Sequence, residues 1–393
     1  MIAPRIPSSP LRNQEHSPTI MRTPSAILLA ALLALPAAAQ KVNDSLVKSD
    51  GSRLRGVEVT ALTLKGAAFA KGKETQELPY HMLAEVEWSS PPDAFVSAMS
   101  AMDRGEYANA AQLFGEAVGK TERAVLKAEA RFLQCKAAVS AAGGDASSAS
   151  AAADALAALL AEVPDHWRTP EALLLLGRAR RVAGKGTDAE QSLKDLDDRS
   201  VREGWGQVWS ARAKLELALT LLDQNRADEA RNAFQAAGST ADSALGSPGP
   251  DENELKAIRT NARVGEGETY VSAKDFPRAI EFFRSLASGN ASPDLVAAAK
   301  AGEGQALFLQ AGDANPAQLR QAQMALAQAS LLDAGSGETA AKANFYLGLC
   351  LLGLGMEKEG DTFKARARNY FQIVVKSYPS TRWASLARAE LAK

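Results

Sequence analysis

The chain is poor in the residues that carry most enzymatic and metal-ion chemistry. Its 393 residues include three histidines and two cysteines, and aromatic residues make up only 6% of it. No two Cys or His residues have the spacing of metal ligands. The G-x-S-x-G, phosphate-loop and H-E-x-x-H motifs are also absent. We therefore expect no catalytic activity, no metal site and no cofactor.

The chain also lacks an excess of charge of either sign. It has 45 Lys and Arg residues against 46 Asp and Glu residues, for a net charge of −1. This balance gives no broad electrostatic footprint for nucleic acid or for an anionic membrane. No apolar run reaches the roughly 20 residues that span a bilayer. The expected partner is therefore a protein or a peptide.

Residues 1–39 have the pattern of a cleaved secretory signal peptide, with Met21 as the start of translation. A short basic segment precedes an apolar stretch at 27–35, and an A-x-A site at 37–39 follows. An uncleaved interfacial helix is the alternative. No cysteine lies near the cleavage site, so the lipid attachment of bacterial lipoproteins is excluded. The pattern predicts an exported protein, periplasmic or secreted.

Residues 40–90 differ in apolar period from the rest of the chain. Short, roughly alternating apolar runs are separated by turns such as Asp50-Gly51 and Lys65-Gly66. One helical turn is expected before the last strand. The pattern predicts a small SH3-like or Sm-like β-domain, which is too small to be stable alone and should dock on the helices that follow.

From Asp93 onward the apolar period is helical, and one spacing recurs. A small residue is followed by an alanine twelve positions later, then an aromatic residue or leucine four further, and a small or apolar residue three beyond. The spacing occurs as Ala98…Ala110-Phe114-Ala117, Gly177…Ala189-Leu193-Leu196, Ala218…Ala230-Phe234-Ala237 and Gly267…Ala279-Phe283-Leu286. Three further pairs keep the second part and predict a longer turn, namely Cys135…Ala152, Gly304…Ala322 and Gly348…Ala367.

This pattern resembles the tetratricopeptide repeat family, in which pairs of antiparallel helices stack into a solenoid. The segments 104–117 and 273–283 match it best, and 370–384 is similar to the envelope branch of the family. That branch includes outer-membrane-assembly lipoproteins and proteins of the Tol–Pal cell-division system. The resemblance implies a mainly α fold, with about seven helical hairpins in a solenoid over 91–379 and a polar capping helix at 380–393.

In such repeats one stripe of each first helix lines a groove that binds extended peptides. The stripe could instead pack inside the superhelix or form a homodimer surface, so the chain could be a monomer or a homodimer. The Lys/Asn arrangement with which relatives clamp a peptide carboxylate is absent. The stripe positions are Phe95, Met99, Met102, Leu215, Leu219, Leu222, Phe345, Leu349 and Leu352.

Other residues that suggest chemistry have simpler explanations. His166 beside Trp167 is expected on the surface, and the acidic cluster at 195–198 in a solvated turn. The glycines of Gly265-Glu266-Gly267 and Gly302-Glu303-Gly304 resemble phosphate loops, but they lie in helical runs and are expected to allow close helix packing. Cys135 and Cys350 are expected to be buried free thiols.

These observations predict a non-catalytic, exported repeat protein that acts as a scaffold or adaptor for protein–protein contacts in the bacterial cell envelope. The alternative is a chaperone-like accessory factor in outer-membrane assembly or in the cell-division machinery.

Overall fold

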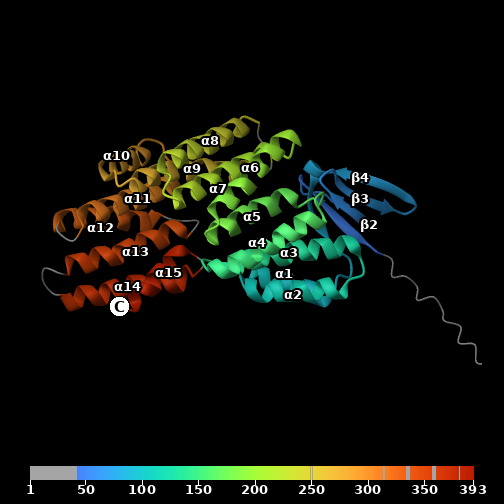
Figure 1. The fold of residues 1–393 in the computed structure, drawn as a ribbon, viewed down its shortest axis with the longest axis horizontal. Coiled ribbons are helices and arrows are strands. Elements are labelled where there is room, and N and C mark those ends of the chain that lie inside the picture. The colour runs from blue at the N-terminus through green and yellow to red at the C-terminus, as the bar shows by residue number, and fades with distance from the viewer. Residues whose placement is uncertain are drawn as a thin grey trace, which may run out of the picture. The chain divides into compact units, whose positions relative to one another are not determined.

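The computed structural model describes residues 42–393 except for 248, 250, 313–314, 333–336, 356–359 and 380. The predicted signal peptide at 1–39 lies outside the described residues, as does Ser380, the expected first residue of the capping helix. The described part begins with a small sheet and continues as a series of helices (Figure 1).

The sheet is antiparallel throughout and has the strand order β4-β3-β2-β1-β5. β2 is the longest strand because its two partners pair with different halves of it: Arg53–Val57 pairs with β1, and Glu58–Thr63 pairs with β3, with an irregularity after Val59. The predicted small β-domain is confirmed. Its elements are β1 (Asp44–Lys48), β2 (Arg53–Thr63), β3 (Gly66–Lys71), β4 (Glu74–Pro79), the 3₁₀ turn η1 (Tyr80–Met82) and β5 (Leu83–Glu87).

Seven helical hairpins and one further helix follow in the described part, which confirms the predicted α-solenoid (Figure 1). First helices of successive hairpins touch from α3 to α13, and each second helix packs against the next first helix. The hairpins are α1 (Asp93–Asp103) with α2 (Tyr107–Lys120), α3 (Ala124–Ala142) with α4 (Ala146–Glu162), α5 (Thr169–Val182) with α6 (Gly186–Arg202), α7 (Gln207–Asp223) with α8 (Ala227–Leu245), α9 (Glu252–Ser272) with α10 (Phe276–Leu286), α11 (Pro293–Ala311) with α12 (Pro316–Leu332), and α13 (Glu338–Leu354) with α14 (Gly360–Ser377). The last helix is α15 (Arg382–Leu391).

The first five hairpins share a three-residue turn. In four of them the middle residue is left-handed, with φ of 72° at Gly105, 74° at Gly184, 60° at Asn225 and 58° at Lys274. Glycine and asparagine adopt this conformation readily, whereas lysine does so at a cost. These four hairpins therefore share one turn geometry although the residues in their turns differ.

The expected lengthening of the turn between α3 and α4 is wrong. This turn is Gly143–Asp145, as short as the others, and the extra residues lie in the longer helices. Fully buried alanines twelve positions apart, Ala137 and Ala149, occupy the places that Ala98 and Ala110 have in the first hairpin. The insertions in the last two hairpins also fall partly in helices. Ala322, for example, is the seventh residue of α12, whereas Ala110 is the fourth of α2.

Glycines in the first helices let aromatic rings of the second helices pack closely. A Cβ atom on Gly267 or on Gly302 would overlap the ring of Phe283, so this ring lies between its own hairpin and the next one. Gly265 has the same relation to Phe234. The glycines that resemble phosphate loops in the sequence are therefore packing positions, as predicted.

The sheet docks on the helices through the segment between α4 and α5. Trp167 is buried in the core of the sheet with Leu46 and Phe69. The backbone N–H of Leu64 donates to the carbonyl of Asp165 (2.8 Å), just after β2 ends.

The expectation of a surface position for His166 is wrong, because this segment runs antiparallel to the end of β2. His166 forms a β-bridge with Thr63 and is only 8% exposed.

Candidate binding site on the first helices

Ion pairs link the first helices of successive hairpins from α3 to α9. Each pair joins a side chain of one first helix to a side chain of the next, so the charges align across the array rather than along one helix. The pairs are Lys136–Glu171 (2.7 Å), Arg178–Glu216 (2.5 Å), Arg181–Asp223 (2.8 Å) and Arg212–Glu254.

A cavity of about 480 Å³ opens among these pairs. All the residues that line it come from first helices or from Arg168, immediately before α5. We call this surface the first-helix site. It consists of Lys136, Ser140, Arg168, Glu171, Leu174, Leu175, Arg178, Trp209, Arg212 and Glu254.

A buried carboxylate holds the sheet end of the first-helix site in place. Glu129 of α3 accepts hydrogen bonds from Trp167 Nε1 (2.7 Å) and from Arg168 Nε (3.2 Å), and the Arg168 guanidinium lies 4.0 Å from the ring centroid of Trp167. Burial alone would raise the pKa of Glu171, but Arg168 and Lys136 outweigh burial and hold it below its ordinary value. Glu171 is therefore charged at neutral pH.

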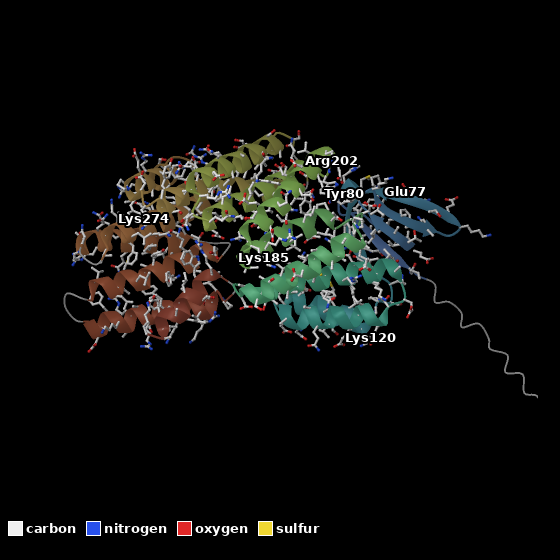
Figure 2. All side chains as sticks on the ribbon, viewed as in Figure 1. Glu77, Tyr80, Lys120, Lys185, Arg202 and Lys274 are labelled. Atoms are coloured by element: carbon white, nitrogen blue, oxygen red, sulfur yellow. The ribbon has the colours of Figure 1, made fainter. Side chains whose placement is uncertain are left out.

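The sheet also reaches the site through Tyr80, which Figure 2 shows where the sheet meets the helices. Tyr80 lies close to Trp209, and burial of its hydroxyl raises its pKa. The guanidinium of Arg212 lies 4.1 Å from the ring centroid of Trp209. Trp209 is thus fixed from both sides, and it gives an otherwise charged site a rigid apolar surface.

Most cations of the site are more exposed than the carboxylates that pair with them. The Arg178 side chain is 43% exposed, whereas that of Glu216 is 7% exposed. Arg178 binds Glu216 through Nε, and its two terminal nitrogens make no hydrogen bond within the described part of the chain. Arg212 and Glu254 show the opposite order. The site therefore presents hydrogen-bond donors with positive charge to any molecule that enters it.

The predicted apolar stripe does not line this cavity. Phe95 and Phe345 are buried at 5% and 6% exposure, and their rings pack on Phe114 and Phe371 inside the core. The other positions are half-buried and pack beside core residues. They are Met99, Met102, Leu215, Leu219, Leu222, Leu349 and Leu352. A groove along these seven positions stays a prediction.

The remaining sequence candidates have structural roles. Asp197 lies in helix α6, not in a turn, and accepts hydrogen bonds from Ser210 (2.5 Å) and from Lys214 (3.0 Å). Among the described residues there is no group of three or more potential metal ligands. Cys135 and Cys350 are free and buried, and burial raises the pKa of Cys350 to about 12.

None of the helices in the described ranges combines the length and the apolar character needed to cross a membrane.

Comparison with known proteins agrees with the hairpin geometry. Residues 342–381 match the family model of the tetratricopeptide repeat. This segment, which includes most of α13 and all of α14, therefore has the sequence of a tetratricopeptide repeat. A comparison with curated proteins gives no match.

Several solved structures are similar at low sequence identity. One is a tetratricopeptide repeat protein from Parabacteroides merdae, with 12% identity, a TM-score of 0.46 and coverage of 76% of this chain and 96% of that one. Another is NprR in complex with its cognate peptide NprX, with 12% identity, a TM-score of 0.44 and coverage of 76% and 82%. The apo form of RapI has 10% identity, a TM-score of 0.46 and coverage of 77% and 87%.

Proposed function

We propose that this chain is a non-catalytic adaptor that binds a partner protein at the first-helix site. The observation that carries the proposal is the cavity of about 480 Å³, lined by Lys136, Arg168, Arg178 and Arg212. Its lining is mainly charged, with an apolar part made by two leucines and a tryptophan, so it suits a partner segment that carries both kinds of group. The aromatic ring of Trp209 adds the kind of anchor that dominates protein interfaces.

The exposed cations favour a partner segment that offers carboxylate or carbonyl oxygens. Arg178 and Lys136 have further donors that no described residue engages, and a charged donor makes a stronger hydrogen bond than a neutral one. The apolar part of the partner segment would lie on Trp209, Leu174 and Leu175. Binding of this kind should weaken as salt concentration rises.

In vivo photo-crosslinking tests this proposal. A photo-reactive amino acid at Ser140, an exposed residue that lines the cavity, should crosslink one defined partner. The same residue at Gln191, exposed on the second helix α6, is the matched control. Arg178→Glu should abolish the Ser140 crosslink because it reverses the charge. Crosslinks that are equal at both positions, or that survive Arg178→Glu, would contradict the proposal.

The same experiment distinguishes binding of the partner at the first-helix site from binding along the predicted apolar stripe. Crosslinkers at Met99 and Leu349 should capture the partner only if the stripe forms a groove. Self-crosslinks from these positions, with light scattering at the mass of a dimer, would instead support the homodimer surface.

We further propose that the protein is exported and works in the bacterial cell envelope. The support for this is the pattern of residues 21–39, with its basic start, apolar stretch and A-x-A site. Alkaline phosphatase fused after Gln40 should be active, because this enzyme folds only in an oxidising compartment. An inactive fusion of full length would overturn the proposal.

A further inference from the structure

The balanced charge of the whole chain conceals an uneven distribution. Between Asp361 and Glu390 the sequence has six Lys and Arg residues and no acidic residue, whereas residues 42–359 have more Asp and Glu than Lys and Arg. The basic stretch covers nearly all of α14 and α15, the last two helices of the array (Figure 1). The solenoid therefore ends in a basic surface, which attracts anions.

The cations of α14 are not neutralised by the fold. Lys364, Arg366 and Lys376 are exposed and make no ion pair within the described part of the chain. The first helices differ in this respect, because Arg178, for example, pairs there with Glu216. The positive charge of α14 is therefore available to a partner.

One stripe of α14 combines two of these cations with an apolar side chain. Arg366, Ile373 and Lys376 have the i, i+7, i+10 spacing that puts residues on one side of a helix. Phe371 and Val374 lie on the other side and are buried in the core. Ile373 is 42% exposed, so the stripe presents a large apolar side chain to solvent among cations. We call these three residues the α14 stripe.

We propose that the α14 stripe docks on the anionic surface of a phospholipid bilayer. A basic surface is complementary in charge to anionic headgroups, and each Lys or Arg close to them strengthens binding about fivefold. An apolar side chain among the cations adds to binding because it enters the headgroup region. The contact is peripheral and leaves the first-helix site free.

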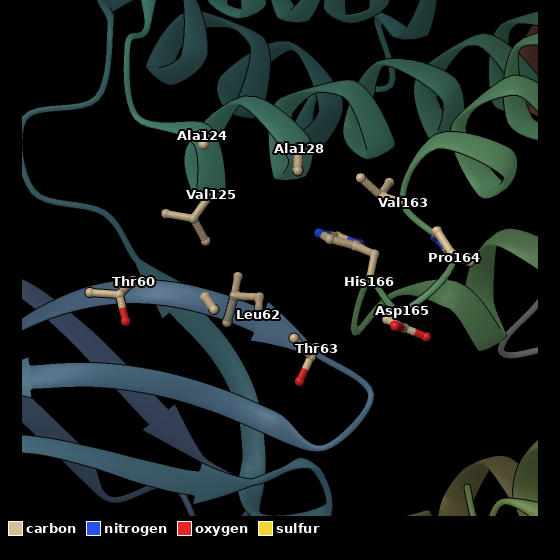
Figure 3. A pocket seen from close by; sticks show the side chains of 11 residues that line it. Thr60, Leu62, Thr63, Ala124, Val125, Ala128, Val163, Pro164, Asp165 and His166 are labelled. Carbon is tan, nitrogen blue, oxygen red and sulfur yellow. The ribbon is translucent and has the colours of Figure 1, made fainter.

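The shape of the surface favours a bilayer over an acidic peptide. Peptides and other small ligands bind in concave sites, such as the cavity of the first-helix site or the cavity between the sheet and the helices (Figure 3). Neither cavity includes a residue of α14 or α15. Exposed cations along one side of a helix instead match a flat surface with many equivalent charges.

Sedimentation with lipid vesicles tests the proposal. The described chain from residue 42 is one compact unit, so a protein that begins at Gln40 suits the test. It lacks the apolar stretch at 27–35, which would itself bind lipid. This protein should sediment with vesicles made of equal parts phosphatidylglycerol and phosphatidylcholine, and not with phosphatidylcholine alone. About 0.5 M NaCl should release it, because salt screens exposed charges.

Variants of exposed residues complete the test. Arg366→Gln combined with Lys376→Gln should weaken binding about 25-fold, at about fivefold for each cation. Lys71→Gln combined with Lys73→Gln is the matched control, because it removes the same charge from an exposed part of the sheet and should change nothing. Ile373→Ser should weaken binding about twofold to fivefold through the loss of apolar contact. Equal urea midpoints would show that all these variants fold.

Three results would overturn the proposal. Equal binding to neutral and to anionic vesicles would exclude recognition of anionic headgroups. An equal loss in the two double variants would mean that the total charge, and not the α14 stripe, causes binding. Release from the vesicles by polyglutamate at an equal concentration of charge would show that the surface prefers an acidic chain to a bilayer.

Discussion

Two regions of the array use the same hairpin in opposite ways. Between α3 and α9 the first helices meet through ion pairs and leave the first-helix site open. Between α13 and α15 aromatic rings fill the corresponding space. Phe345 lies 5.4 Å from Tyr346 and 5.6 Å from Trp383, measured between ring centroids. The repeat thus fixes how helices pair, while the residues that face the next hairpin decide whether the surface is open or closed.

The buried pair Lys342–Glu268 sharpens this contrast. It joins α13 to α9, which are not successive first helices, and both of its side chains are largely shielded from water. Burial lowers the pKa of Lys342, although Glu268 opposes the shift. An ion pair in this position connects the closed region to the end of the open one, and it has little surface to offer a partner.

Replacement of a tryptophan by alanine in each region should give the largest difference in the free energy of unfolding. Trp383→Ala removes a buried ring and the donor to Glu338 (2.7 Å), and should lower the free energy of unfolding by about 3–5 kcal/mol. Trp209→Ala removes a half-buried ring that lines the cavity, and should cost less than half as much. Urea unfolding of both variants measures the difference, and equal losses would contradict the division into open and closed regions.

A methyl group placed between two hairpins should have the next largest effect. Gly302→Ala puts a Cβ into the ring of Phe283 and should destabilise the fold by about 1–3 kcal/mol. Gly119→Ala is the matched control, because this helical glycine has open space around it and the change should stabilise the helix by about 0.5–1 kcal/mol. If Gly302→Ala raised the urea midpoint, close packing at this position would be excluded.

Acid should weaken the junction of the sheet with the helices. Burial lowers the pKa of His166 below its ordinary value of 6.5, so the neutral ring stabilises the fold fully above that pH. As the pH falls below 6.5 toward the folded pKa, this contribution should be lost at up to about 1.4 kcal/mol per pH unit.

Urea midpoints of the wild type and of His166→Gln between pH 7.5 and pH 5 test this expectation. The variant should depend less steeply on pH than the wild type. His81→Gln, at an exposed position, should keep the wild-type slope. If the urea midpoints of the wild type and of His166→Gln depended equally on pH, His166 would not be the cause of the acid sensitivity.

The smallest expected effect concerns the shared turn. Lys274 has the left-handed conformation that Gly105 has in the first hairpin, so Lys274→Gly should stabilise the protein by about 0.5–1 kcal/mol. Gly105→Lys should destabilise it by a similar amount. Thermal unfolding of the two variants measures both signs, and two shifts in the same direction would show that the turns are not equivalent.

The sequence predicts the hairpins well because the residues that define each hairpin lie close together in the sequence. Ala110 and Phe114 follow Ala98 at fixed distances. Four groups of residues keep this whole spacing and three keep its second part, and together they predict seven hairpins. The glycine interpretation holds for the same reason: Gly267 lies where the repeat requires a small residue, and Phe283 is the large residue that fills the space. The turn between α3 and α4 was mispredicted because many alanines there fit the spacing in more than one register.

The candidate sites could not be predicted in this way. Arg178 and Glu216 lie on different hairpins, and nothing in either segment shows that they pair across the array. One usable signal was the i, i+7 spacing of Glu171 and Arg178, which puts two charges on one face of a first helix. His166 was misplaced because its burial depends on contact with Thr63, which is remote in the sequence.

The place of Trp167 in the core of the sheet has a consequence for how the protein is made. The strands leave the ribosome first, but the tryptophan that completes their core is synthesised only after two hairpins have followed. The core of the sheet is therefore incomplete until the segment after α4 has been synthesised. For the same reason, the sheet without the segment between α4 and α5 would lack one of the side chains that fill its core.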